Sequence, residues 1–111
     1  MSEVINKAEK LAEAIVESEE FLEMKESELK VDNDEEAAKL VEKVENMQKK
    51  IDRNKKNEEL KKKMAELQRK TWQNRKIKTF LQKQQQFSKL MKRVNTKITD
   101  ALNPESSEEA S

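Results

Sequence analysis

The stretch of sequence that decides the fold is residues 77–101, IKTFLQKQQQFSKLMKRVNTKITDA. Apolar side chains recur in it at alternating steps of three and four residues, and one glutamine interrupts them. Because an α-helix turns every 3.6 residues, this spacing keeps one narrow stripe facing a partner helix over about four heptads. It predicts a coiled-coil-like seam made by Ile77, Phe80, Gln84, Phe87, Met91, Val94, Ile98 and Ala101.

Two further features extend this pattern. Leucines beside the stripe widen it toward the face of a helix in a globular bundle. Residues 37–51 repeat the alternation, again with one glutamine among the apolar residues. We expect both stripes to bury helix against helix, and the predicted interface also includes Leu81, Leu90, Val41, Val44, Gln48 and Ile51.

Gln48 and Gln84 are the polar interruptions of the two stripes. A lone polar side chain in a helical seam lowers stability but can set register and partner number, because it needs a matching hydrogen-bond partner. One hypothesis is that the two glutamines meet, within a subunit or across a dimer. The alternative, given equal weight, is that each lies where its stripe reaches solvent.

Polar capping residues, rather than glycine or proline, divide the chain into four or five predicted helices. Ser2 is expected to cap the first helix and Ser18 the second, because a hydroxyl oxygen accepts hydrogen bonds from free backbone N–H groups. The acidic turn at residues 32–34 is expected to begin a third helix near Glu35. At residues 71–74 the sequence leaves open whether the fourth helix breaks or continues.

The end of the chain and one internal segment set the predicted domain organisation. Residues 52–57 are polar throughout and form a candidate hinge between two halves. Asn103 and Pro104 are expected to end the last helix. We therefore predict a single helical domain over residues 1–103 and a disordered acidic tail over residues 104–111.

The apolar content is low for a chain that folds alone. Of 111 residues, 33% are hydrophobic and 42% are charged, so the core available to one copy is thin. A helix over residues 74–102 would be roughly 43 Å long, whereas a compact chain of this size has a radius of gyration of roughly 13 Å. We expect an all-α protein, a long antiparallel helical hairpin or bundle with coiled-coil-like seams. A second copy is expected to cover the part of the long helix that extends beyond the globule, which makes the protein a homodimer.

The composition excludes most catalytic chemistry. The chain contains no glycine, no histidine and no cysteine. It therefore lacks the usual phosphate-cradling loop, the commonest general bases and nucleophiles, and the commonest zinc ligands. We predict a protein that is not an enzyme and has no cofactor, no metal and no small-molecule substrate. Because the first residues carry no apolar signal core, we also expect a cytoplasmic protein without a membrane segment.

The net charge of +1 conceals an uneven distribution. Residues 1–48 contain 15 acidic and 6 basic side chains, whereas residues 49–97 contain 4 acidic and 18 basic ones. The favoured explanation is that acidic and basic helices pack antiparallel and pair across their seams. The alternative is an exposed basic surface for nucleic acid or an acidic protein, with Lys61, Lys62, Lys63, Arg69, Lys70, Arg75 and Lys76 as its candidate residues.

The function that we predict is that of a protein–protein interaction protein, a regulatory adaptor with the apolar stripe of the last helix as its main interface. Direct nucleic-acid binding is the less favoured alternative. The segment 49–97 lacks the leucine spacing of a basic zipper, and its two phenylalanines lie on the apolar seam. Trp72 is the one aromatic residue outside that seam in this segment, and we expect it to be packed at a helix boundary rather than free for base stacking. Binding by this segment would be independent of sequence and sensitive to salt.

The chain resembles the bacterial YlbF, YmcA and YheA family. The resemblance is carried first by residues 8–48, AEKLAEAIVESEEFLEMKESELKVDNDEEAAKLVEKVENMQ, with a Leu-Ala element, a Ser-Glu-Glu-aromatic cap at residues 18–21 and an acidic turn before a helix that ends in Gln48. The second half resembles the family's closing helix at Ile77, Phe80, Gln84, Phe87, Leu90 and Val94.

This resemblance implies a small cytoplasmic all-helical protein that dimerises through long helices and is not an enzyme. YlbF and YmcA act as adaptor-like proteins with a third protein, YaaT, on ribonuclease Y and messenger RNA processing, and thereby on competence, sporulation and biofilm formation. This chain has no counterpart of their cysteine-containing tails, so cluster binding is not carried over, and its length is closest to the YheA branch. Arg75 stands where relatives often have proline.

Overall fold

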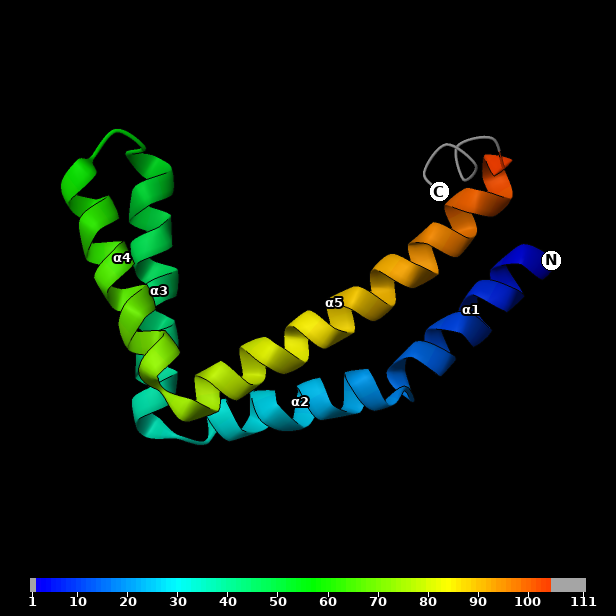
Figure 1. Ribbon diagram of the computed structural model, residues 1–111, viewed down its shortest axis with the longest axis horizontal. Coiled ribbons are helices and arrows are strands. Elements are labelled where there is room, and N and C mark those ends of the chain that lie inside the picture. The colour runs from blue at the N-terminus through cyan, green and yellow to red at the C-terminus, as the bar shows by residue number, and fades with distance from the viewer. Residues whose placement is uncertain (1, 105–111) are drawn as a thin grey trace.

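The computed structural model describes residues 2–104, and this part of the chain consists of five α-helices without a β-strand. Figure 1 shows the chain as an open L. The result confirms the predicted all-α fold. The helices are α1 (Glu3–Val16), α2 (Glu19–Asp32), α3 (Glu35–Arg53), α4 (Glu58–Gln73) and α5 (Arg75–Leu102).

A polar side chain caps the N-terminus of every one of these helices. In each case a side-chain oxygen accepts a hydrogen bond from the backbone N–H three residues later, at 2.9 to 3.3 Å. Four of the five helices also begin with glutamate, which suits the positive end of the helix dipole. The caps explain how a chain without glycine makes sharp helix boundaries, and they are Ser2, Ser18, Asp34, Asn57 and Asn74.

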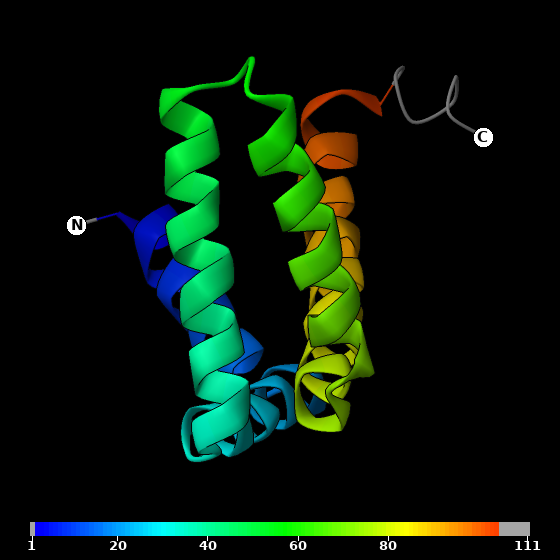
Figure 2. The same cartoon turned by 90° about the vertical axis from the view of Figure 1, so that its left-hand side faces the viewer.

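The five helices form two structural parts that meet at a corner. Helices α2 and α5 pack antiparallel and, with α1, form an extended arm (Figure 1). Helices α3 and α4 form a hairpin that projects from the arm, as Figure 2 shows from the side. The Cα radius of gyration is 18.8 Å, against roughly 13 Å for a compact chain of this length. The long last helix therefore extends beyond any globular core, as the sequence predicts.

The corner, which we call the elbow, holds the hydrophobic core. Val31 from α2, Ala37 from α3 and Ile77 from α5 are buried there, with exposed fractions of 4%, 0% and 4%. Partly buried side chains pack around them: Leu40, Val41, Phe80 and Leu81. Because three helices contribute one small cluster, the elbow fixes the angle between arm and hairpin.

Beyond the elbow, α2 and α5 are joined by an aromatic pair and an ion pair. The rings of Phe21 and Phe87 meet edge to face with centroids 5.5 Å apart. Glu23 Oε2 lies 3.1 Å from Lys83 Nζ. These contacts agree with the explanation that acidic and basic helices pair in antiparallel orientation.

Asp34 ties the start of α3 to the start of α5. Its carboxylate accepts a hydrogen bond from the Ala37 backbone N–H at 2.9 Å and lies 3.2 Å from Lys76 Nζ. The backbone hydrogen bond, followed by the bond from Lys76, lowers the pKa of this carboxyl group. Deprotonated Asp34 is therefore the form that fits the elbow.

The structure locates the predicted hinge and the predicted end of the last helix. The candidate hinge at residues 52–57 is the tip of the α3–α4 hairpin: α3 ends at Arg53, and α4 begins at Glu58. It therefore connects two helices that pack on each other instead of separating two halves. Asn103 caps the end of α5, as expected. The predicted tail lies, apart from Pro104, outside the described residues, and the division into domain and tail stays a prediction.

Candidate interaction surfaces

Burial along the predicted α5 seam decreases from the elbow outward. Ile77 is buried, and Ile98, six turns farther on, is 47% exposed. Between them lie half-buried apolar residues: Phe80, Leu81, Phe87, Leu90, Met91 and Val94. Helix α2 is the main neighbour of α5 within the chain. The chain's own helices therefore bury the apolar side chains at the elbow end of the seam and leave those at the other end exposed.

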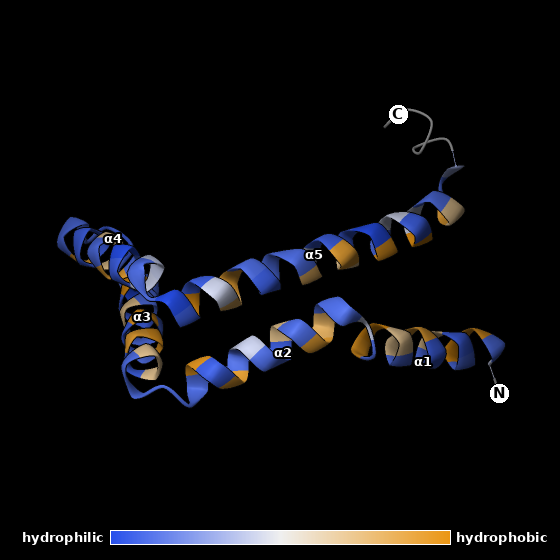
Figure 3. Ribbon diagram, turned by 60° about the horizontal axis from the view of Figure 1, so that its bottom comes forward, coloured by the Kyte–Doolittle hydropathy of each residue, from blue (hydrophilic) through white to orange (hydrophobic). Residues whose placement is uncertain are grey.

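Helix α1 does not cover that open end. In the described structure none of its residues is buried, and its packing contacts are with α2 at their junction rather than along α5. Figure 3 shows α1 and α5 diverging, with hydrophobic residues along both helices. We call this region the arm tip and define it by the exposed apolar residues Val4, Ile5, Leu11, Val16, Ile98 and Leu102.

The exposure at the arm tip is large for side chains of this kind. Val4 is 75%, Ile5 57% and Leu102 74% exposed. Single exposed apolar residues are ordinary on a protein surface, but a set on two neighbouring helices is typical of an interaction site. Sequence reasoning placed Ile98 in an interface but did not include α1, although the apolar spacing of residues 4–16 was visible.

A second apolar surface lies where the hairpin meets the arm. An open groove of about 540 Å³ is lined by three helices, with Glu45 and Gln68 among its polar residues. Trp72 is 53% exposed there, which corrects the expectation that it is packed. The apolar lining includes the predicted interface residues Val41, Val44, Ile77, Phe80 and Leu81.

The two glutamines do not meet within one copy. Both are exposed, and Gln48 Nε2 donates a hydrogen bond to Asp52 Oδ1 at 3.0 Å within α3. Because α3 belongs to the hairpin and α5 to the arm, the fold carries Gln48 and Gln84 apart from the elbow (Figure 1). Ile51, the last residue of the α3 stripe, is half-buried. Pairing of the glutamines across a dimer stays a prediction.

All seven candidate residues of the basic surface are exposed: Lys61, Lys62, Lys63, Arg69, Lys70, Arg75 and Lys76. Three of them form ion pairs with acidic residues of the same chain. Lys61 and Arg69 pair within α4 at 4.0 and 3.9 Å, and Lys76 pairs with Asp34. The basic half is therefore accessible, and part of its charge is compensated locally.

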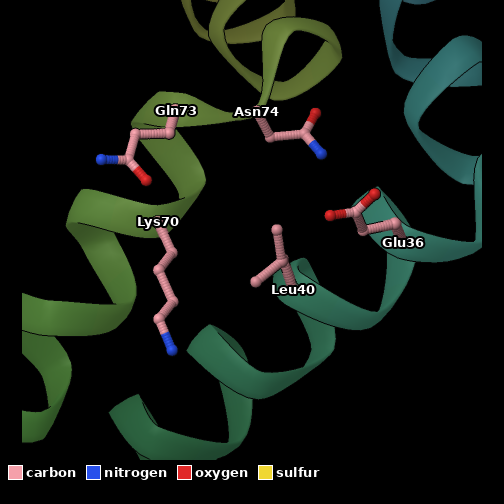
Figure 4. Close-up of a pocket in the computed structure, with 5 residues that line it drawn as sticks. All are labelled: Glu36, Leu40, Lys70, Gln73 and Asn74. Carbon is pink, nitrogen blue, oxygen red and sulfur yellow. The ribbon is translucent and has the colours of Figure 1, made fainter.

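The close-up in Figure 4 shows the chemistry available in a small pocket between α3 and α4, beside the start of α5. Its volume is about 210 Å³. Leu40 lies between Glu36 on one side and Lys70 on the other, and the remaining groups are the amides of Gln73 and Asn74. The Asn74 oxygen already caps α5 by accepting from the Ile77 N–H. The pocket thus combines the capping amide of Asn74 with one exposed carboxylate, of Glu36, and one exposed ammonium group, of Lys70.

Residues 2–104 show neither a metal-binding cluster nor a membrane-spanning helix. No group of three or more acidic, histidine or cysteine side chains is placed there to hold a metal ion. None of the helices in this range combines the length and the apolar character needed to cross a bilayer. What stands out in the described chain is therefore apolar helical surface.

Comparison with solved structures finds a similar fold in RicA of Bacillus subtilis, crystallised in complex with RicF. The TM-score is 0.75 at 22% sequence identity, and the match covers 97% of this chain and 96% of that one. Comparison with curated protein sequences found no match. The likeness to RicA establishes the fold.

A family match extends over residues 4–103, which include all five helices except the first residue of α1. It confirms the resemblance that the helix caps and apolar spacing indicate. The chain belongs to the family described as control of competence regulator ComK, YlbF/YmcA.

Proposed function

We propose that this protein is a regulatory adaptor without enzymatic activity, which acts by binding other proteins through exposed helical faces. The observation that carries the proposal is the arm tip, where Val4 and Leu102 are three-quarters exposed on helices that extend beyond the elbow core. Burying such an apolar surface against a partner removes it from water and lowers the free energy of the complex.

The comparisons support the same role. The family description concerns control of a competence regulator, and the similar RicA was crystallised with another protein, RicF. We propose that the partners of this chain include a second copy of itself and a further protein linked to RNA processing or developmental regulation. A cytoplasmic location is part of the proposal and can be checked by cell fractionation.

Affinity capture from the bacterium that encodes the chain tests this function. The wild-type protein is compared with an Ile98→Asp/Leu102→Asp variant, which places carboxylates on the arm tip. Lys62→Ser/Arg69→Ser on the hairpin is the matched control, because these two residues are exposed and lie far from the tip. Quantitative mass spectrometry should show specific partners with the wild type and the control, and at least about tenfold depletion of them with the tip variant. Equal recovery with all three proteins would contradict the proposal.

A second candidate function is sequence-independent nucleic-acid binding by segment 49–97. It is favoured by the seven exposed basic residues of that segment. Fluorescence anisotropy with short single-stranded RNA at stepwise salt concentrations separates the two candidates. The adaptor proposal predicts negligible binding at about 0.15 M salt. Micromolar binding that falls steeply with salt and is lost in Lys62→Ser/Arg69→Ser would instead support the second candidate.

A further inference from the structure

The end of the α3–α4 hairpin carries a concentration of positive charge. Residues 49–57 contain five basic side chains and one acidic side chain. All five basic side chains are exposed, and within the described part of the chain none of them forms an ion pair. We call these residues the basic cluster: Lys49, Lys50, Arg53, Lys55 and Lys56.

The nearest carboxylates in the sequence are engaged with other side chains. Asp52 Oδ1 accepts a hydrogen bond from Gln48 Nε2 at 3.0 Å, and Glu58 pairs with Lys61 at 4.0 Å. The acidic helices α1 and α2 belong to the arm, and Figure 1 shows them away from this end of the hairpin. The antiparallel pairing of α2 with α5 therefore does not extend to the basic cluster.

Helix electrostatics account for only part of the basic cluster. Lys50 and Arg53 lie in the last turn of α3, where cations suit the negative end of the helix dipole. Lys55 and Lys56 lie outside both helices and directly precede Asn57, which caps α4. At that end of a helix the dipole favours negative charge. The local structure therefore does not explain why the positive charge continues through the connection.

We propose that the basic cluster binds an acidic segment of a partner protein and is a second interaction surface, separate from the arm tip. The proposal rests on the proposed function, because an adaptor needs one surface for each protein that it joins. Complementary charges on two proteins speed their association and orient them as they meet.

The chemistry of the basic cluster favours carboxylates over nucleic acid. Residues 49–63 contain no aromatic side chain, so this end of the hairpin offers no platform on which a base can stack. Four of the five cations are lysines, which lack the forked geometry with which arginine binds phosphate. The carboxylates of Asp52, Glu58 and Glu59 would repel a continuous chain of phosphates, whereas a flexible acidic segment can place its carboxylates between them.

The shape of the chain keeps the two surfaces apart. The arm tip belongs to α1 and α5, and the basic cluster lies at the end of the hairpin that points away from the elbow (Figures 1 and 2). Because the arm and the hairpin diverge from the elbow, a protein bound at one surface leaves the other accessible. The chain can therefore hold an apolar partner surface and an acidic segment at the same time.

Fluorescence anisotropy of a labelled peptide of alternating glutamate and serine tests the proposal with the full chain. The wild type should bind this peptide at about 0.05 M salt, and the Kd should rise at least about fivefold by about 0.2 M salt. A peptide with glutamine in place of glutamate should not bind. Lys55→Glu/Lys56→Glu should raise the Kd for the acidic peptide at least about tenfold.

A matched variant controls for the overall charge of the protein. Lys89→Glu/Lys92→Glu makes the same charge change at exposed positions of α5 that form no ion pair in the described structure. Its Kd should stay within about twofold of the wild type, because charges farther apart than the Debye length are screened. Circular dichroism verifies that both variants keep their helices.

Single-stranded RNA with the same net charge as the peptide decides between the two classes of partner. The proposal predicts weaker binding of RNA than of the acidic peptide at about 0.15 M salt. Tighter binding of RNA that is lost in Lys55→Glu/Lys56→Glu would assign the basic cluster to nucleic acid and overturn the acidic protein segment.

Zero-length cross-linking extends the test to natural partners. Carbodiimide joins an ammonium group to a carboxylate that contacts it directly. In complexes captured by the wild-type chain, Lys55 and Lys56 should be joined to peptides rich in aspartate and glutamate. Absence of such links at these two lysines, with or without links at Lys89 and Lys92, overturns the proposal.

The outcomes separate this inference from the proposed function. Failure of the acidic peptide to bind at about 0.05 M salt, or equal loss of binding in both charge variants, overturns the basic cluster and leaves the arm tip unaffected. The arm-tip variant Ile98→Asp/Leu102→Asp should bind the peptide as the wild type does, because it leaves the basic cluster unchanged. If that variant also captures partners normally, the arm-tip proposal fails while the peptide result stands.

Discussion

The elbow and the arm tip are built from the same kinds of residue but differ in what surrounds them. Ile77 at the elbow and Ile98 near the tip lie on one stripe of one helix, yet their exposed fractions are 4% and 47%. At the elbow, α2 and α3 both pack against α5, whereas at the tip α1 diverges from it. The difference teaches that this chain buries one half of its seam in folding and leaves the other half exposed, the half that we propose binds partners.

The largest expected effect comes from the same substitution at both ends of the stripe. Ile77→Ala should lower the free energy of unfolding by about 3 kcal/mol, because it leaves a cavity in the small elbow core. Ile98→Ala should cost less than about 1 kcal/mol in dilute protein, since its side chain is half-exposed there. Urea unfolding followed by circular dichroism measures both.

Protein concentration sharpens this comparison. The cost of Ile98→Ala should rise with concentration as dimers form, while the cost of Ile77→Ala should stay constant. Equal costs at every concentration would show that the two ends of the stripe are not used differently.

The middle of the arm should give an intermediate effect. Phe21→Leu and Phe87→Leu retain apolar side chains but remove the edge-to-face contact at 5.5 Å. Their double-mutant cycle should give a coupling energy of about 1 kcal/mol. A parallel cycle of Phe21→Leu with Ile98→Ala should give no coupling. A value near zero for the phenylalanine pair would mean that α2 and α5 separate in solution closer to the elbow than the structure shows.

The cap at the elbow should respond to pH, whereas the cap at the tip should not. Because the folded-state pKa of Asp34 lies below its ordinary value of 3.8, its contribution to stability is complete above that value and is lost as the pH falls through the lower folded-state pKa. Asp34→Asn retains a capping oxygen but does not titrate. It should lower the melting temperature by a few degrees at neutral pH and by less in strong acid. Ser2→Ala, as the control at the tip, should show a pH-independent difference.

The smallest effect should come from surface ion pairs. Lys83→Met removes the contact with Glu23 between α2 and α5, where the side chains are 31% and 37% exposed. Lys7→Met removes the contact with Glu3 within α1, where they are 75% and 83% exposed. The first should cost about 0.5 kcal/mol and become smaller at high salt, and the second should be unmeasurable by thermal unfolding. A larger cost for Lys7→Met in concentrated protein would indicate that α1 is covered there.

Helix boundaries were predictable because capping is local. Ser2, Ser18 and Asp34 start helices as expected, since each needs only the backbone N–H groups of the next turn. The break at Asn74 could not be predicted, because the same residues can continue a helix. It is decided at the elbow, where the start of α5 must meet Val31 and Ala37. The exposure of Trp72 could not be predicted either, because it depends on which distant helices pack beside that side of α4.

The sequence by itself determined that the chain is helical, where most helices begin, and which residues form the apolar stripe of α5. These properties depend on turn-by-turn spacing and on short hydrogen bonds that any stretch of the chain makes with itself. Only the tertiary structure decided which end of the stripe is buried, that the two glutamines diverge, and that α1 shares the open end. These properties depend on where distant helices pack, and the elbow, a cluster drawn from α2, α3 and α5, sets that position.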